Sequence, residues 1–203
     1  MILADLGVSS MQLDDPERGF TFKSDARLDM RMNPNHGQSA AQLLAKLDEG
    51  KLAKLLDENS DEPRAVRLAR VILQAQMRQP IETTQALADV VCTSILQIPG
   101  CTTDDAALTI RRVFQSLRIA VNDELGALDA LLKQLPASLK SGGRVAILTF
   151  HSGEDRRVKQ AFKAGMAGGI YAAATDFMLR PTPEEQHANP RSSSAKLRFA
   201  TRM

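Results

Sequence analysis

Short apolar runs near both ends of the chain predict β-strands. Residues 1–6 (MILADL) end at Gly7 and are typical of a buried strand in a parallel sheet. Residues 144–150 (RVAILTF) follow a Ser-Gly-Gly turn and give the clearest strand pattern of the chain. Residues 195–201 alternate with period two and predict a final strand. Strands separated by helical segments in this order predict an α/β fold.

Helical periodicity dominates the segments between these strands. Ser39 and Gln42 make a capping box before a leucine-rich stretch, and 39–100 is interpreted as an all-helical module. Apolar spacing predicts one or two long helices over 104–140 and another over 154–164. Within the module, four arginines lie off the apolar stripe of one helix: Arg64, Arg67, Arg70 and Arg78.

Two stretches have no clear period. Residues 11–38 are rich in Asp, Gly, Pro and Asn and predict a loop that is long for a loop without function. Residues 165–190 are rich in Gly, Ala and Pro, and no regular element is predicted there. Because only three strands are visible, we interpret the chain as the C-terminal part of a doubly wound sheet with a helical insertion. A buried first strand needs neighbours on both sides, which indicates a missing segment before Met1.

The charge is small overall but unevenly distributed. The 203 residues carry 26 Lys and Arg against 24 Asp and Glu, a net charge of +2. Residues 12–62 hold 11 acids and 7 bases, a net of −4, whereas residues 63–203 hold 12 acids and 19 bases, a net of +7. A basic C-terminal two-thirds is compatible with a polyanionic partner and equally with an ordinary solvated surface.

Composition argues against several classes of protein. Only Cys92 and Cys101 are present, without metal-ligand spacing, so neither a disulfide scaffold nor a metal site is expected. No apolar run approaches the roughly 18 residues of a membrane-spanning helix, and the first residues lack the basic region of a secretory signal. With no Trp and one Tyr, a sheet that stacks bases on aromatic rings is not expected.

The segment after the first strand carries candidate binding chemistry. Asp5 is followed by Gly7 and by the hydroxyls of Ser9 and Ser10, just past the carboxyl end of a strand, where open α/β sheets bind ligands. Asp5 can accept a hydrogen bond from an amine, and Gly7 permits close approach to the backbone. A structural turn rich in Asp and Ser explains the same pattern.

A second candidate follows the strand over 144–150. His151 and Ser152 are adjacent, but no G-x-S-x-G elbow surrounds the serine, so nucleophilic catalysis is not expected. Ser152 is expected to cap the next helix, with Glu154 and Asp155 favouring its N-terminus. A structural role for His151 is favoured over a catalytic one.

Basic and amide side chains offer a third candidate. Four polar residues recur at helical spacing on one face: Arg111, Gln115, Arg118 and Asn122. Four bases follow Glu185 without another acid: Arg191, Lys196, Arg198 and Arg202. Guanidinium and amide groups can bind phosphate, so RNA contacts are expected here, with a solvated face or a local ion pair of Arg118 as the alternative.

Taken together, these segments resemble the bacterial and organellar family of small-subunit ribosomal RNA cytosine-N4 methyltransferases (RsmH, formerly MraW). The matching stretches run in the family's order along nearly the whole chain: DLGVSSMQLD (5–14), PERGF (16–20), LDMRM (28–32), FQSLRIAVNDEL (114–125), SGGRVAILTFHSGEDRRVK (141–159) and NPRSSSAKLR (189–198). The resemblance implies a partial Rossmann-like methyltransferase domain (1–14 and 104–203) with a loop and inserted helical domain (15–103). It also implies S-adenosyl-L-methionine as donor, a cytosine in ribosomal RNA as target, and no metal.

By position, the resemblance assigns roles to single residues. Asp5 and Gln12 are expected to contact the donor, and Asp5 is also the candidate catalytic residue, because an acceptor there can orient the amine and draw off charge. The target base would have to leave its stack. Weaker candidates for substrate contacts are Ser9, Ser10, Arg118 and His151.

The sequence departs from the family's pattern. It contains neither the glycine-rich D-G-T-x-G-x-G-G-H-S loop nor the acidic residue that holds the donor's ribose, so a truncated or divergent member with weak donor binding is expected. The family's YGEERFA stretch appears as 59–65 (NSDEPRA), and FHSLEDR has Gly153 in place of Leu. The alternative function is a non-catalytic RNA- or ribosome-binding remnant.

The resemblance also sets expectations for partners. The small ribosomal subunit and its RNA are the expected partners, without a membrane, and a homodimer is left open. An open apolar edge at the first strand favours self-association. The expected location is the bacterial cytoplasm, with the mitochondrial or plastid matrix as the eukaryotic alternative.

Overall fold

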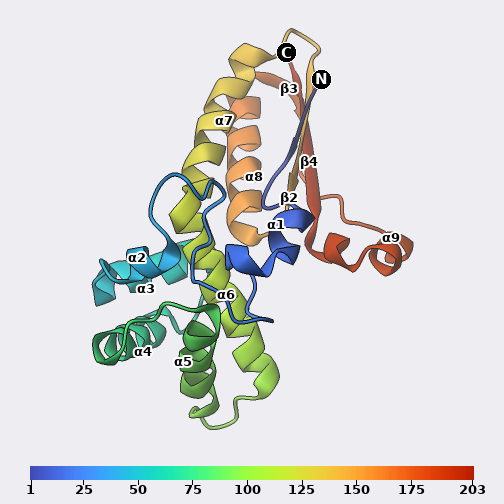
Figure 1. The fold of residues 1–203 in the computed structure, drawn as a ribbon. Helices are drawn as coiled ribbons and strands as arrows, with labels where there is room; N and C mark the ends of the chain where they lie inside the picture. Colours follow the sequence, from blue (N-terminus) through green and yellow to red (C-terminus); the bar gives the residue numbers. More distant parts are fainter. The chain divides into compact units, whose positions relative to one another are not determined.

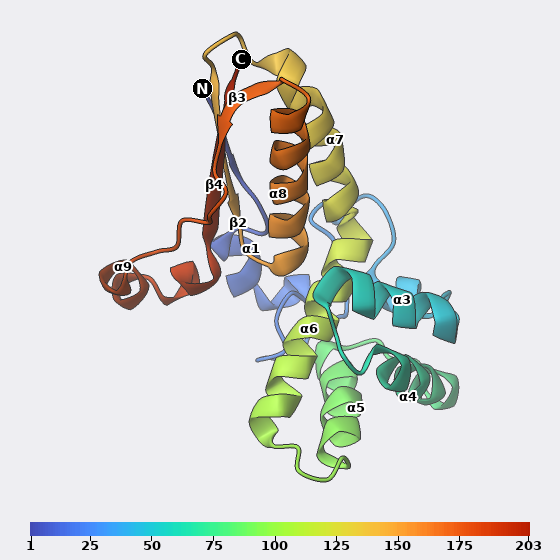
Figure 2. The same ribbon diagram turned by 180° about the vertical axis from the view of Figure 1, so that it is seen from behind.

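The computed structural model describes residues 1–203, which divide into two compact units. The first unit comprises 1–7 and 124–203, and the second unit is the continuous segment 8–123. Figures 1 and 2 show the ribbon from opposite sides. No helix of the structure is both long and apolar enough to span a bilayer.

The first unit is a four-stranded mixed sheet with helices on one face. Its elements are β1 (Ile2–Asp5), α7 (Glu124–Ser138), β2 (Arg144–Thr149), α8 (Ser152–Ala167), β3 (Tyr171–Ala174), α9 (Pro183–Ala188), η2 (Pro190–Ser194) and β4 (Lys196–Arg202). The strand order is β1-β2-β4-β3. β1 pairs parallel with β2, from Ile2 opposite Val145 to Asp5 opposite Leu148, and β4 runs antiparallel to both of its neighbours. α7 and α8 lie side by side along one face of the sheet (Figures 1 and 2).

The core of the first unit forms where alternating strand residues meet α7 and α8. Val145 and Ile147 of β2 are fully buried, because every second residue of the strand faces the helices. Phe162 of α8 packs edge to face on Tyr171, with ring centroids 5.6 Å apart. Gly165 makes this possible, because a Cβ at that position would overlap the Tyr171 ring.

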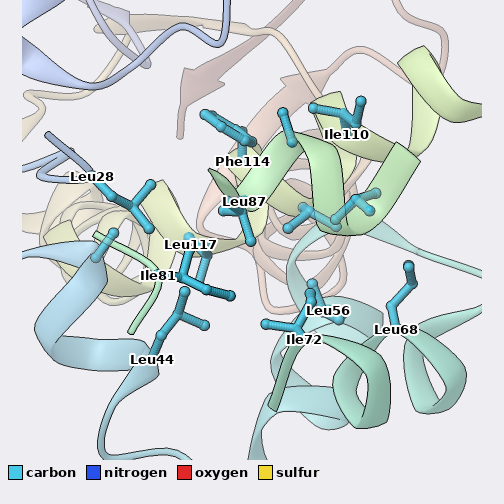
Figure 3. Packing of buried hydrophobic residues seen from close by; sticks show 14 of the residues in the cluster. Leu28, Leu44, Leu56, Leu68, Ile72, Ile81, Leu87, Ile110, Phe114 and Leu117 are labelled. Atoms are coloured by element: carbon cyan, nitrogen blue, oxygen red, sulfur yellow. The ribbon is translucent and has the colours of Figure 1, made fainter. Parts of the chain in front are cut away.

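The second unit is helical. Its elements are α1 (Ser10–Asp14), η1 (Pro16–Arg18), α2 (Ala40–Leu44), α3 (Glu49–Ser60), α4 (Ala65–Arg78), α5 (Thr84–Leu96) and α6 (Thr103–Asn122). Leucine and isoleucine side chains from α3, α4, α5 and α6 converge in its core (Figure 3). Among them Leu56, Leu68, Ile72, Leu87 and Leu117 are completely buried. Their burial follows the 3.6-residue spacing of the apolar positions in each helix.

The loop before α2 is ordered by hydrogen bonds. Arg18 donates to the carbonyls of Arg31 (2.9 Å) and Met32 (2.8 Å). Asn122 of α6 donates to the Met30 carbonyl (2.8 Å) and accepts from the Met32 N–H (2.7 Å). Met30 is fully buried in the left-handed region (φ 63°), a conformation that a residue with a Cβ adopts only where its surroundings fix it. Gly19 also has a left-handed backbone (φ 70°), and a Cβ there would overlap a carbonyl oxygen of the loop.

The α/β class and the three predicted strands are confirmed. The prediction that 165–190 holds no regular element is wrong, because β3 and α9 lie there. The capping box of Ser39 and Gln42 is confirmed at the start of α2.

The unit boundaries differ from the expected domains. Residues 8–14 and 104–123 lie in the second unit rather than with the methyltransferase-like sheet. α6 belongs there because Val113, Phe114 and Leu117 pack into the helical core.

Candidate functional site

The ends of β1 and β2 lie side by side at one edge of the first unit. The Leu6 N–H donates to the Leu148 carbonyl (3.1 Å), which extends the parallel pairing by one residue beyond Asp5. Gly7 then turns with φ +88°, and a Cβ there would lie 3.8 Å from the Phe150 ring. The exposed carboxylate of Asp5 therefore stands at the carboxyl end of a parallel strand pair, the place where α/β sheets bind ligands.

The segment after β2 is held by a reciprocal cap on α8. His151 is the N-cap residue, and its Nδ1 accepts from the Glu154 N–H (3.4 Å). The Glu154 carboxylate returns to accept from the backbone N–H groups of Phe150 (2.8 Å) and His151 (3.4 Å). The prediction that Ser152 caps this helix is wrong, because Ser152 is already its first helical residue and the imidazole takes the capping position.

Glu154 is a buried carboxylate that stays ionised. Burial disfavours its charged form, but the neighbouring His151 imidazole and the backbone N–H groups of Phe150 and His151 outweigh burial, so the pKa of Glu154 lies below its usual value of 4.5. His151 Nε2 lies 3.4 Å from Glu154 Oε1 but makes no hydrogen bond there. The carboxylate thus fixes the backbone of Phe150, which lies against Gly7.

A buried ion pair lies next to this cap. Arg198 of β4 is 1% exposed and donates from Nε (2.7 Å) and Nη2 (3.1 Å) to the two oxygens of Asp155 in α8. Arg202 donates to the carbonyls of Ile170 (2.6 Å) and Pro136 (3.3 Å). The expectation that Arg198 and Arg202 bind RNA is therefore wrong, because their guanidinium groups tie β4 to the rest of the first unit.

In the second unit, Ser9 and Gln12 bind each other. The Ser9 N–H donates to Gln12 Oε1 (2.9 Å), and the Gln12 N–H donates to Ser9 Oγ (3.3 Å), which makes a capping box for α1. Ser10 is exposed at the first position of that helix. Ser9 and Gln12 thus have a local structural role in addition to the roles that the family resemblance implies for them.

The polar face predicted on α6 is largely used by the fold. Gln115 donates to the Asn59 carbonyl (3.0 Å), and Asn122 holds the loop at Met30 and Met32. Arg118 is half-buried in the same helix. The expectation that Gln115 and Asn122 bind phosphate is wrong, because their amides are committed to backbone groups of the second unit.

The structure brings together only some of the predicted site residues. Asp5 and His151 meet at the end of the sheet in the first unit, while four others belong to the second unit: Ser9, Ser10, Gln12 and Arg118. The network of Glu154 and His151 was missed as a site feature. Its signal was present, since a residue that can accept a hydrogen bond three positions before Glu is the spacing of a capping box. Across the chain, no group of three or more His, Cys, Asp or Glu side chains is arranged to hold a metal.

Comparison with known proteins decides the family. The model of the MraW methylase family matches residues 1–203. The chain belongs to the MraW methylase family. It is 48% identical over 201 residues to a protein of Lachnoclostridium phytofermentans named ribosomal RNA small subunit methyltransferase H 1, covering 98% of this chain and 55% of that protein.

Two further members are similarly close. A ribosomal RNA small subunit methyltransferase H 2 of Alkaliphilus metalliredigens is 47% identical over 98% of this chain and 58% of its own length. A methyltransferase H 1 of Agathobacter rectalis is 47% identical over 99% of this chain and 58% of its own length. The chain thus spans between 55% and 58% of these MraW relatives.

Proposed function

We propose that this chain carries the acceptor side of a methyl transfer from S-adenosyl-L-methionine to the exocyclic N4 amine of a cytosine in small-subunit ribosomal RNA. The observation that carries the proposal is the exposed Asp5 beside Gly7 and Phe150 at the end of a parallel strand pair, in a chain that matches the MraW methylase family. The names of the relatives support ribosomal RNA as the class of substrate.

Asp5 acts on the amine of the base. The lone pair of an exocyclic amine is delocalised into the ring, which makes the nitrogen a poor nucleophile. A carboxylate that accepts one of its N–H groups turns the lone pair toward the methyl group and stabilises the positive charge that develops on nitrogen. Asp5 then takes up the proton that the methylated amine loses and releases it to water.

The residues at the sheet end fit part of the methyl donor. S-adenosyl-L-methionine, when bound, supplies an electrophilic methyl group on a sulfonium. An exposed carboxylate such as Asp5 suits a ligand that carries amine donors, and Gly7 leaves the backbone open to close approach. The family's glycine-rich donor loop is not among the 203 residues.

The cap on α8 keeps this edge in place. Glu154 holds the Phe150 N–H, and the Phe150 ring lies against Gly7, so the cap positions the turn that follows Asp5. Neither His151 nor Glu154 needs to touch the substrate for this role. We place the reaction where small ribosomal subunits are assembled, in the bacterial cytoplasm or an organelle matrix.

A methyl-transfer assay tests the proposal. The chain is incubated with S-adenosyl-L-methionine carrying a labelled methyl group and small ribosomal subunits that lack the modification. We expect label on a cytosine, and a loss of about 10²–10⁴ in rate for Asp5→Asn, the range for a group that handles a proton. Asp104→Asn, an exposed acid at the start of α6, is the matched control and should leave the rate unchanged.

Two outcomes would contradict the proposal. Unchanged transfer by Asp5→Asn removes Asp5 from the chemistry. Absence of transfer by the unaltered chain, together with retained binding to the subunit, favours the alternative of a binding protein without catalysis. Titration calorimetry with S-adenosyl-L-methionine measures donor binding separately.

A further inference from the structure

A surface hollow of about 1070 Å³ lies along α3 and α4 in the second unit. Figures 1 and 2 show these two helices next to each other. The hollow is lined by cations from both helices and from the turn between them: Lys54, Arg64, Arg67 and Arg70. Two acids share the lining, Asp57 and Glu62. We call this surface the α3–α4 hollow.

The charge of Glu62 is turned into the protein. Its side chain is completely buried, its Oε1 accepts from the Arg64 N–H (3.0 Å), and its Oε2 lies 3.5 Å from Nη1 of Arg112. A carboxylate neutralised inside the unit contributes little to the potential at the surface. Asp57 is thus the single exposed acid in the lining, against four cations.

The cations of the hollow have partners that they can exchange. Arg70 lies 3.1 Å from Glu49, and the two side chains are 60% and 44% exposed. Arg67 is exposed and donates one Nη2 N–H to the Ser94 carbonyl (3.2 Å). A guanidinium has five donors, and exposed ion pairs are weak, so both groups can bind an added anion without disturbing the core.

The arrangement suits an extended polyanion rather than a single ion. Arg67 and Arg70 are three residues apart and therefore neighbours on α4. Lys54, 72% exposed, stands on α3 at the same hollow. Val66, 61% exposed, adds an apolar surface beside the arginines. Cations spread along a hollow can contact successive phosphates, and an apolar side chain can contact a ribose or base.

We infer that the α3–α4 hollow binds the phosphate backbone of an RNA strand. This inference rests on the proposed function, because it names the surface that would hold the RNA whose cytosine is methylated. It replaces the sequence-based expectation for Gln115, Asn122 and Arg198, whose polar groups are committed to the fold.

Fluorescence anisotropy with the whole chain and a short fluorescein-labelled single-stranded RNA tests the inference. We expect the double variant Arg67→Gln/Arg70→Gln to bind roughly tenfold more weakly at low salt, because two charge-assisted contacts are lost. The slope of log affinity against log salt should fall by about 0.7 for each phosphate contact removed. Lys54→Gln alone should give a smaller loss in the same direction.

The control is Lys159→Gln/Lys163→Gln, which removes two exposed charges one turn apart on α8 of the first unit. It should leave affinity and slope unchanged. Melting curves should coincide for all variants, since the altered side chains are exposed. The assay contains no methyl donor, so failure of methyl transfer leaves this inference standing.

Three results would overturn the inference. One is an equal effect of the α4 and α8 double variants, which would reduce the hollow to general surface charge. The second is an absence of RNA binding by the unaltered chain at low salt. The third is displacement of the RNA by polyglutamate as effectively as by unlabelled RNA, which would assign the hollow to an acidic protein surface.

Discussion

The first unit joins two segments that are far apart in the chain, whereas the second unit is one continuous segment. They also differ in what their cores contain. The first unit buries three charged residues near one end of its sheet: Glu154, Asp155 and Arg198. The second unit buries a wide cluster of aliphatic side chains and a single charged residue, Glu62. Buried charge therefore gathers where the candidate chemistry lies, as expected when local rules are broken for function.

The largest expected effect is on the buried ion pair of the first unit. Arg198→Ala leaves Asp155 buried without its partner, and removing one member of such a pair costs about 3–5 kcal/mol of unfolding free energy. Urea unfolding measures the loss. Arg157→Ala is the control, because its pair with Asp129 is partly exposed and should contribute about 0–1 kcal/mol. Similar losses for both variants would show that the pair of Arg198 does not distinguish this unit.

A smaller effect is expected at the polar contact of the second unit. Asn122→Ala removes hydrogen bonds to Met30 and Met32, at about 1 kcal/mol each, without opening the aliphatic core. Hydrogen exchange should show lost protection in the loop 15–38 while α4 and α5 stay protected. Asn122→Asp keeps the acceptor for the Met32 N–H and should lie between the two. Uniform loss of protection across the unit would contradict a local role.

The smallest effect concerns pH. The folded-state pKa of Glu154 is lowered, so this residue stabilises the first unit above its unfolded pKa near 4.5 and loses that contribution as pH falls through the folded value. Thermal melting from pH 7 down to pH 3 should therefore show stability declining below about pH 4.5. Glu154→Gln should flatten that decline. An identical acid limb in the variant would remove Glu154 as its source.

The sequence predicts elements that carry their own pattern and misses those that depend on a distant partner. β2 and β4 are recognisable from alternation, and α2 from its capping box. β3 (Tyr171–Ala174) has one large apolar residue and three alanines, and it is a strand because it pairs with β4.

The candidate site is predictable to the same extent. Asp5 follows from its place after a strand, and the cap of His151 follows from its spacing to Glu154. Asn122 and Arg198 are of residue types that are usually exposed. Their partners lie 92 and 43 positions away in the chain, so no local pattern reveals their burial.

The parallel pairing of β1 with β2 has a consequence for synthesis on the ribosome. Ile2 pairs with Val145, which is 143 positions later in the chain. At about 5–20 residues per second, β1 waits roughly 7–29 s for its partner strand. The second unit, 8–123, is complete before that and can fold during the delay. The apolar β1, with Leu3 65% exposed even in the finished sheet, is then the segment most dependent on chaperones.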